Sequence, residues 1–419
     1  MPRPAERLAV TGWGAITPLG SDPASTWEAM VAGHSGIDLV GDSWATDLPV
    51  RIAGRVAPGF DEQLEPLQRR RLDRCAQLAL LAARQARRQA APHLEGVDPG
   101  RVAVVIGTGI GGLSTLEWQH TNLLQSGPGR VNPLTVPMLI PNAAAGQVAI
   151  DLGLHGGAHT PVSACASGAE ALLLAQLLLL DDRVDVVLAG GCEAPVNRLG
   201  LVGFAAMRAL SSRNDAPTQA CRPYGRDRDG FVLSEGAGML VLQRSGDLRS
   251  TAPAPLGWLL ACGSSSDGHH IVAPEPEGLQ AARAIADALR RSGLQTADLS
   301  FVQAHATGTP IGDLAEARAL RRGLGKAADG LPVTAPKGQL GHLLGAAGAV
   351  EMILALQGLR QGLVPRSLNA DPLDPAVDLA VVKDRSLPLP SGSGERYALK
   401  NAFGFGGHNI SLVLAALPA

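Results

Sequence analysis

Two stretches of the chain follow one plan, and this repetition constrains the fold more than any other sequence feature. Residues 160–180, TPVSACASGAEALLLAQLLLL, read as a short apolar segment, a turn of small residues around Cys165 and a long apolar helix. Residues 334–359, TAPKGQLGHLLGAAGAVEMILALQGL, repeat the plan with Lys337 and His342 at the turn. Both helices are apolar on nearly every face, which predicts that both are buried. The repetition indicates an internal duplication, and the alternation of strands with helices favours a layered α/β fold.

Apolar strands and helices also alternate along the rest of the chain. We expect a strand at residues 8–10 that ends in a turn at 11–14, an excursion on the surface at 36–65, and a single helix at 68–90. Further strands are expected at 101–106, 184–189, 239–242, 256–262, 300–304, 333–335, 397–400 and 410–415, and further helices at 27–32, 141–152, 278–292, 314–322 and 341–359. We expect one half of the fold at residues 1–255 and the other at 256–419.

The bulk properties exclude several classes of protein. The formal net charge of -2 gives no overall attraction to nucleic acid or to an anionic membrane. Five scattered cysteines without a CxxC pair fit neither a disulfide scaffold nor a zinc site, so a reducing cytoplasm is expected. The N-terminal residues lack the apolar core of a signal peptide, and the run 171–180 is too short to span a bilayer. We therefore expect a soluble protein that needs no metal.

A glycine motif follows the strand expected at residues 101–106. Gly107, Gly109 and Gly112 match the GxGxxG spacing of dinucleotide-binding proteins. That motif also needs a helix opening at the glycines and an acidic residue about 20 positions further on, and residues 125–133 offer neither. We therefore expect these glycines to let the backbone pass close to a ligand or to another chain.

Cys165 is the first candidate for chemistry. It lies where a helix should begin, and the unpaired N–H groups and partial positive charge of a helix N-terminus lower the pKa of a thiol. A cysteine is more often a small buried hydrophobe. The small neighbours Ser163, Ala164, Ala166 and Ser167 favour a nucleophile instead, because they leave room for a substrate beside the sulfur.

Four chemical groups stand where strands meet helices or loops, which is where α/β folds bind ligands. They are Cys165, His305, Lys337 and His342. A lone histidine is more often structural, but a lysine at the start of an apolar helix is expensive to bury without a role. Together they suggest a thiol nucleophile, two imidazole donors and a cation, which suits acyl transfer with a stabilised oxyanion or enolate.

Six motifs, in order along nearly the whole chain, resemble those of the β-ketoacyl-acyl carrier protein synthases, the KAS I/II type of condensing enzyme. They are VTGWGAITPLG, PVSACASG, DRDGFVLSEGAG, AHATGTPIGD, APKGQLGH and NAFGFGGHN. The resemblance implies a thiolase-like fold, five-layered αβαβα and built from two pseudo-duplicated halves, in an obligate dimer. It implies no cofactor, because the substrates arrive on the phosphopantetheine of acyl carrier protein.

The resemblance also implies roles for individual residues. Cys165 would carry the acyl chain as a thioester, and the enolate formed by decarboxylation of malonyl-carrier protein would attack it. His305 and His342 would stabilise the enolate oxygen through Nε2–H. Lys337 would tune the electrostatics of the site. The N–H groups of Cys165 and Phe405 would form the oxyanion hole.

Further positions resemble supporting residues of that family. They are a gatekeeper at Phe405, an acid beside Lys337 at Glu351, a second loop near the site with Asp267 and His270, an acyl pocket with Ile110, Met138 and Phe403, and docking arginines for the acidic carrier protein at Arg70, Arg71 and Arg208. Departures from the family pattern at Ala306, Gly338, Gln339 and His408 leave the chain length of the substrate open.

Other functions remain as alternatives. A coenzyme A thiolase needs a second cysteine near the C-terminus, and the last cysteine here is Cys262. A relative that condenses primers has Asn in place of the second histidine, whereas His342 is present, and a non-catalytic partner subunit lacks the nucleophilic cysteine. Fatty-acid elongation by a homodimer is favoured. A type II polyketide ketosynthase paired with a chain-length-factor subunit stays open.

Overall fold

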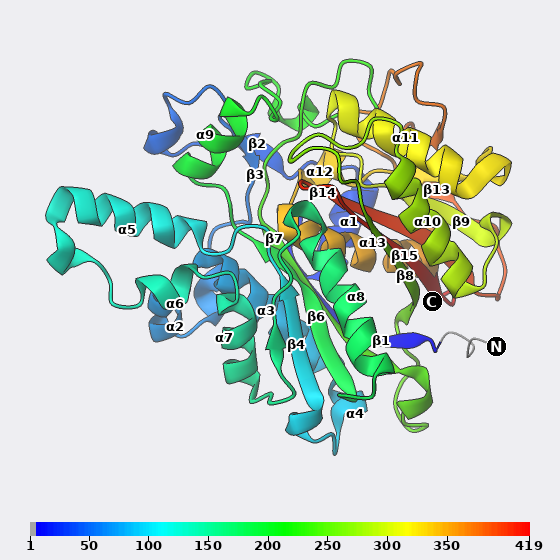
Figure 1. Ribbon diagram of the computed structural model, residues 1–419, viewed down its shortest axis with the longest axis horizontal. Coiled ribbons are helices and arrows are strands. Elements are labelled where there is room, and N and C mark those ends of the chain that lie inside the picture. The colour runs from blue at the N-terminus through cyan, green and yellow to red at the C-terminus, as the bar shows by residue number, and fades with distance from the viewer. Residues whose placement is uncertain (1–5) are drawn as a thin grey trace.

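The computed structural model describes residues 6–419, and eleven of its strands form one large sheet (Figure 1). These strands are β1 (Leu8–Ile16), β4 (Val102–Gly107), β5 (Ala158–His159), β6 (Val186–Glu193), β7 (Gly236–Arg244), β8 (Gly257–Ser266), β9 (Leu299–Gln303), β10 (Pro332–Thr334), β12 (Ala380–Val381), β14 (Arg396–Gly404) and β15 (His408–Ala416). Their order across the sheet is β12-β10-β9-β14-β15-β8-β1-β7-β6-β4-β5. The small pairs β2 (Ile37–Leu39) with β3 (Ile52–Gly54), and β11 (Leu363–Val364) with β13 (Leu387–Pro388), lie apart from it.

The strand order repeats itself in the two halves. From the outside inward, the first half runs β5-β4-β6-β7-β1, and the second, inside its short edge strand β12, runs β10-β9-β14-β15-β8. In each half the three outer strands are parallel to one another and the two remaining contacts are antiparallel. The predicted duplication is therefore confirmed by topology. The predicted boundary between residues 255 and 256 falls in the connection between β7 and β8 and stays a prediction.

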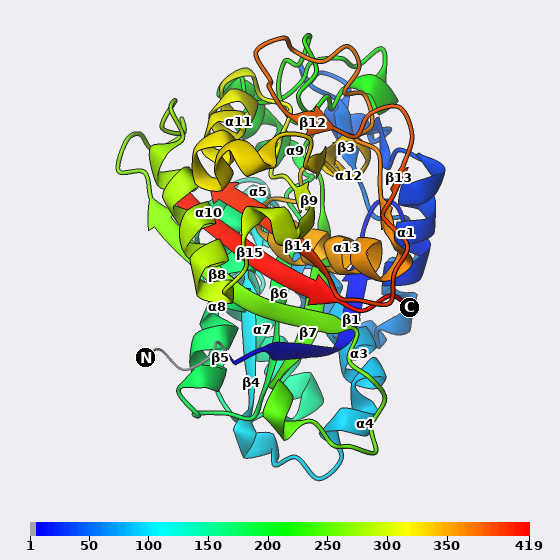
Figure 2. The ribbon, with the colours of Figure 1, turned by 90° about the vertical axis from the view of Figure 1, so that its right-hand side faces the viewer.

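The strands of the two halves form two layers, and helices between and outside them make five layers in all. In the centre, α8 (Ser167–Leu180) and α13 (Ala347–Gln361) contact each other and strands of both halves. Outside the first half lie α3 (Arg74–Gln89) and α7 (Ala143–Leu152), and outside the second half α10 (Leu279–Ser292) packs on β8 and β15 with α11 (Pro310–Leu324) beside it (Figure 2). The remaining helices are α1 (Pro23–Ala32), α2 (Pro66–Arg71), α4 (Ala91–Leu94), α5 (Leu113–Ser126), α6 (Thr135–Leu139), α9 (Arg198–Ala206) and α12 (Lys337–Leu340). This is the predicted αβαβα arrangement of a thiolase-like fold.

Glycines bring the two central helices together. A Cβ added to Gly348 at the start of α13 would lie 2.3 Å from the backbone nitrogen of Ala169 in α8, and one on Gly168 would lie 2.7 Å from the carbonyl oxygen of Gly345. Only glycine permits backbones to approach so closely. This contact places the turn before α8 beside the turn before α13.

The two central helices differ in burial. Helix α13 is buried over nearly its whole length, as predicted, whereas α8 leaves Leu177 and Leu180 exposed. The prediction that α8 is buried all round is therefore wrong, because only part of its surface packs on β4, β6 and α13. Of residues 6–419, no helix is both long and apolar enough to cross a membrane.

Strand β1 corrects the expectation of a turn at residues 11–14. The strand continues to Ile16 with an irregularity between Val10 and Gly12. Its glycines serve packing, because a Cβ on Gly12 would lie 2.3 Å from Ala86 O and one on Gly14 would lie 2.1 Å from Ala82 O, both in α3. Glycines in a strand can mark such close approach as well as a turn.

Two further expectations differ from the structure. The helix expected at 68–90 is divided into α2 and α3, because Asp73 caps the second helix by accepting a hydrogen bond from Cys75 N. The segment 36–65 contains β2 and β3, and its Ile37 and Ile52 are buried in the apolar cluster that includes Cys165. Its burial was not visible in the sequence because its partners lie far away along the chain.

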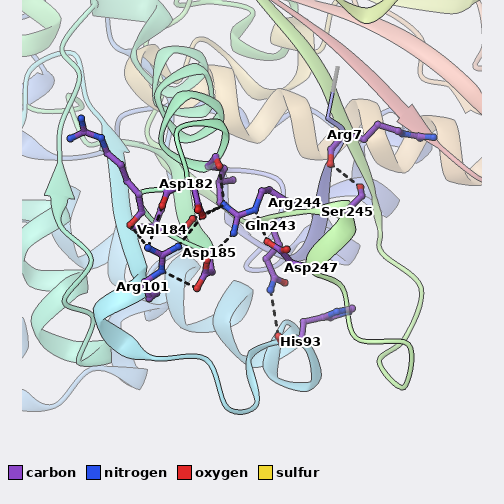
Figure 3. A network of polar contacts seen from close by, with 12 residues as sticks. Arg7, His93, Arg101, Asp182, Val184, Asp185, Gln243, Arg244, Ser245 and Asp247 are labelled. Atoms are coloured by element: carbon purple, nitrogen blue, oxygen red, sulfur yellow. Dashed lines mark hydrogen bonds and ion pairs between the residues drawn. The ribbon is translucent and has the colours of Figure 1, made fainter. Parts of the chain in front are cut away.

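Charged residues connect strands β4, β6 and β7 at one end of the first half. Arg101 precedes β4, Asp185 precedes β6 and Arg244 ends β7, and both arginines donate to the Asp185 carboxylate (Figure 3). The Nη2–Oδ1 distances are 2.7 Å from Arg101 and 2.8 Å from Arg244. Because these side chains are partly exposed, their ion pairs add little to the free energy of unfolding. We infer that they mainly hold the three strands in register.

The close contact of α8 with α13 makes a testable prediction. We expect Gly348→Ala to lower the free energy of unfolding by about 1–3 kcal/mol, because its methyl group must displace backbone. The control is Gly203→Ala in α9, where an added Cβ meets nothing within 4 Å and the change should be neutral or stabilise by about 0.5–1 kcal/mol. Urea denaturation at one protein concentration measures both, and equal effects would contradict the packing argument.

Candidate active site

Cys165 lies in a strained turn directly before α8. The turn at Ala164–Ala166 is 3₁₀-helical, and Ala164 has a left-handed φ of 51°. The Ser167 hydroxyl braces it, accepting from Ser163 N at 2.9 Å and donating to Ala164 O at 2.6 Å. A non-glycine residue in this backbone region costs about 1–3 kcal/mol and is held only by its surroundings. The turn thus fixes the direction of the thiol.

Burial raises the pKa of the Cys165 thiol to about 12. The charge of Lys337 and the backbone N–H groups of Phe405 and Cys165 itself oppose this rise, while Glu193 adds to it. The prediction that the helix N-terminus lowers the pKa is wrong in its net direction, because desolvation disfavours the thiolate more strongly than the dipoles favour it. The free protein therefore holds a thiol.

The loop after β14 lies against the Cys165 turn. A Cβ on Gly404 would lie 2.5 Å from Ser163 O and 3.3 Å from Cys165 N. The backbone N–H groups of Phe405 and Cys165 both lower the pKa of the thiol, and the two residues line one cavity, so both groups act at the sulfur to which an acyl group would be attached. Two convergent N–H donors are the arrangement that an oxyanion hole requires.

A cavity of about 370 Å³ opens onto the thiol. The predicted site residues that line it are Cys165, Arg208, Asp267, His305, His342, Phe403 and Phe405. Its walls also include apolar and small residues such as Ala273, Pro310 and Ile311. One cavity therefore joins the thiol, both histidines and the glycine-rich loop, which come from both halves of the chain.

His305 follows β9, and the Lys337 ammonium contacts the Nδ1 side of its ring. Lys337 Nζ lies 3.5 Å from His305 Nδ1 and 2.5 Å from Glu351 Oε1. An ammonium can only donate, so Nδ1 accepts and the ring proton is assigned to Nε2. Burial and the charge of Lys337 lower the pKa of His305 well below 6.5, so the ring is a neutral donor at physiological pH.

His342 faces His305 edge to face, with ring centroids 5.3 Å apart. Its backbone is fixed to the segment before β7, since its N–H donates to Val232 O at 2.8 Å and its carbonyl accepts from Ser234 N at 3.0 Å. Burial, followed by the charge of Lys337, lowers the pKa of His342 well below 6.5. Both imidazoles are therefore neutral hydrogen-bonding groups rather than cations.

Two buried carboxylates that the sequence analysis did not single out shape the site. Glu316 of α11 accepts the backbone N–H groups of His305 at 2.8 Å and Ala306 at 2.7 Å. Glu193, at the end of β6, accepts from Gly109 N at 2.6 Å and Gly345 N at 3.0 Å. Burial raises the pKa of Glu193 and these donors oppose the rise. For Glu193, an acidic residue at the end of an apolar strand was the available signal in the sequence.

The glycine motif at Gly107, Gly109 and Gly112 allows backbone segments to pack closely around the site. Helix α5 does open at Leu113, which corrects the expectation that no helix follows the motif. A Cβ on Gly107 would lie 2.2 Å from Ser167 O, and one on Gly112 would lie 2.4 Å from Met138 O. The backbone therefore passes close to other segments of this same chain.

Lys400 was also missed. It lies on β14, is fully buried, and its Nζ is 3.1 Å from Glu351 Oε2. Burial lowers the pKa of Lys400 to about 8. The argument that singled out Lys337, that a buried ammonium is costly, applies equally to a lysine in the strand YALKNAF and would have found it.

The segment around Asp267 is tied to the glycine-rich loop. Asp267 accepts from Asn409 Nδ2 at 2.7 Å, and its N–H donates to Gly407 O at 2.9 Å. His270 is exposed and does not line the cavity; its Nδ1 accepts from the backbone N–H groups of two residues, Val272 and Ala273. Any movement of one of these loops would therefore involve the other.

The remaining predicted site residues are more scattered. Ile110 packs against the cluster that contains Cys165, and Met138 is buried on α6, but neither lines the cavity, so their place in an acyl pocket stays a prediction. Arg208 follows α9 and lines the cavity. Arg70 and Arg71 are exposed on α2, which lies apart from α9 in Figure 1.

Comparisons with known proteins match the chain over nearly its whole length. Residues 5–247 match the family described as beta-ketoacyl synthase, N-terminal domain, and residues 256–371 match beta-ketoacyl synthase, C-terminal domain. A 3-oxoacyl-[acyl-carrier-protein] synthase 2 from Staphylococcus aureus is 38% identical over 99% of both chains.

Solved structures agree. A type II polyketide synthase acyl carrier protein in complex with its ketosynthase gives a TM-score of 0.89 at 27% identity, covering 99% of this chain and 100% of the other. A ketosynthase in complex with its chain length factor from Xenorhabdus doucetiae gives 0.85 at 26% identity, covering 98% of each chain. With both halves matched in sequence and in fold, the chain belongs to the β-ketoacyl synthase family.

Proposed function

We propose that this protein is a β-ketoacyl-[acyl carrier protein] synthase that elongates fatty-acid chains by decarboxylative condensation. The observation that carries the proposal is the single cavity that joins Cys165, the two neutral histidines and the convergent N–H groups of Cys165 and Phe405. A thiol, two neutral donors and an oxyanion hole are the groups that acyl transfer followed by enolate formation requires.

The first half-reaction loads the acyl chain. The Cys165 sulfur attacks the thioester carbonyl of an acyl-carrier protein, the C–S bond to Cys165 forms, and the carrier leaves as its thiol with the proton. The oxyanion of the tetrahedral intermediate is held by the N–H groups of Cys165 and Phe405. Because the free thiol has a pKa of about 12, these donors and the charge of Lys337 must favour the thiolate as it attacks.

The second half-reaction forms the new C–C bond. Malonyl-carrier protein loses carbon dioxide, and the electrons of the broken bond form an enolate whose oxygen accepts hydrogen bonds from His305 and His342. The enolate carbon then attacks the acyl carbonyl on Cys165, and collapse of the intermediate releases the β-ketoacyl-carrier protein and the Cys165 sulfur, which regains a proton. Neutral imidazoles suit this role because they donate without surrendering a proton.

Two features of the surface, exposed arginines and exposed hydrophobic side chains, support the proposed partners. Arg208 at the cavity and Arg70 and Arg71 on α2 are proposed to meet the acidic carrier protein. The large hydrophobic side chains exposed along α5 to α8 support association with a second chain. They include Trp118, Leu124, Val136, Ile150 and Leu177. A homodimer in the cytoplasm is proposed.

The alternative is a ketosynthase of a type II polyketide pathway with a chain-length-factor partner. It is favoured by the solved structures of ketosynthases with an acyl carrier protein and with a chain length factor. The curated relative favours the fatty-acid reaction. A coenzyme A thiolase is the weaker candidate, because no cysteine follows Cys262.

The nucleophile can be tested directly. We expect Cys165→Ala to abolish the mass increase that an acyl-carrier protein produces on the wild-type protein. Cys262→Ala is the matched control, because burial also raises the pKa of Cys262 to about 12 but it does not line the cavity. Intact-mass spectrometry measures both, and acylation that persists in Cys165→Ala would contradict the assignment.

The role of His305 is separable from that of the thiol. We expect His305→Ala to keep acylation of Cys165 while malonyl decarboxylation falls by roughly 10²–10³-fold, as for loss of an oxyanion donor. Release of carbon dioxide from malonyl-carrier protein is the measurement, with the exposed His155→Ala as control. Unchanged decarboxylation would remove His305 from the enolate-stabilising role.

The purified chain also distinguishes the two pathways. We expect the chain alone to be a dimer by light scattering and to condense acyl-carrier protein with malonyl-carrier protein. A chain that is inactive alone and gains activity only with a related partner subunit would support the polyketide alternative and overturn the homodimer.

A further inference from the structure

Two buried lysines share one carboxylate beside the site. Lys337 Nζ lies 2.5 Å from Glu351 Oε1, and Lys400 Nζ lies 3.1 Å from Glu351 Oε2. All three side chains are 0% exposed. The contact of Lys400 with Glu351 is an ion pair, and the hydrogen bond found for Lys400 Nζ among residues 6–419 is to Asn401 O at 2.7 Å. Each oxygen of Glu351 thus faces a different lysine.

This arrangement is not a balanced ion pair. With both lysines protonated, the three groups carry a surplus positive charge, and a buried surplus charge is costly. The charge of Lys400 contributes, after burial and the charge of Lys337, to the lowered pKa of both His305 and His342, which line the cavity. Glu316 of α11 also acts on Lys400, but it is already engaged by the backbone N–H groups of His305 and Ala306. A cost of this kind is tolerated where a site uses it.

The alternation of β14 links the two carboxylates that fix His305. Successive side chains on a strand point to opposite faces. Lys400 meets Glu351 of the central helix α13, and Asn401 Nδ2 donates to Glu316 of the outer helix α11 at 3.1 Å. Glu316 holds the backbone of His305, and Glu351 holds its ring through Lys337. Lys400 and Asn401, which are neighbours on β14, therefore contact the two carboxylates that hold His305.

We propose that Lys400 is a positioning residue of the condensation: by occupying one oxygen of Glu351, it keeps Lys337 between the other oxygen and Nδ1 of His305. This inference rests on the proposed function. With a neutral side chain at position 400, both oxygens of Glu351 become available to Lys337. Lys337 then moves toward the carboxylate and away from the imidazole. His305 loses the contact that keeps its proton on Nε2, and the enolate loses a well-aligned donor.

The proposal makes the second half-reaction depend on the charge of Lys400. Burial lowers its pKa to about 8; the charge of Lys337 also lowers it, and Glu351 and Glu316 oppose. The pKa values of His305 and His342 lie well below 6.5, burial raises that of Asp313 on α11 to about 7, and that of Cys165 lies near 12. Loss of the Lys400 proton between about pH 7 and 9 should therefore lower decarboxylation as the pH rises.

The test compares the two half-reactions in full-length variants. We expect Lys400→Met to acylate Cys165 within about twofold of the wild type, while kcat for malonyl decarboxylation at pH 7.5 falls by on the order of ten- to a hundredfold with KM little changed. The wild type should lose decarboxylation between about pH 7 and 9, and the rate of the variant should not change over that range. The exposed Lys326→Met is the control and should retain the wild-type profile.

The outcomes separate the two proposals. A wild type without acylation or decarboxylation overturns the proposed function. An active wild type with a Lys400→Met variant of the same kcat and pH profile overturns the role of Lys400 alone. If Lys400→Met does not fold by circular dichroism, Lys400→Gln, which keeps a donor for Asn401 O, takes its place under the same criteria.

Discussion

The close approach of α8 to α13 is the contact on which the rest of the site depends. Because Gly348 and Gly168 let backbone meet backbone, the turns that precede the two helices lie side by side in the centre of the molecule. One turn belongs to the first half and carries Cys165; the other belongs to the second half and follows His342. The duplicated topology therefore produces one site from two similar halves, each supplying a different chemical group.

Buried charge then gives this site its character. Glu193, Glu316 and Glu351 each accept backbone N–H groups or an ammonium instead of water. Glu193 holds the glycine motif at Gly109, Glu316 holds the backbone of His305, and Glu351 holds the Lys337 ammonium. Burial meanwhile keeps Cys165 as a thiol and the histidines neutral. The hydrogen-bond donors of the site are therefore held in place by the fold, where they can stabilise charges that develop during the reaction.

Much of this could be predicted from the sequence, and the failures have physical causes. The duplication, the central helices and the groups Cys165, His305, Lys337 and His342 were found because local patterns mark them. The turn expected at Gly12 and Gly14 was a strand, because glycine marks close approach as well as turns. The lowered pKa expected for Cys165 failed, because desolvation depends on what surrounds the turn and not on the helix alone. Lys400 was overlooked because its partner lies on another element.

The sequence by itself determined the layered α/β fold, its duplication and the residue types of the reaction, since periodicity, small-residue turns and motif order are local properties. Only the tertiary structure decided which groups share a cavity, which nitrogen of His305 bears the proton and which lysines share Glu351. Those facts depend on distances of a few ångströms between residues far apart in the chain, and on the burial that such packing creates.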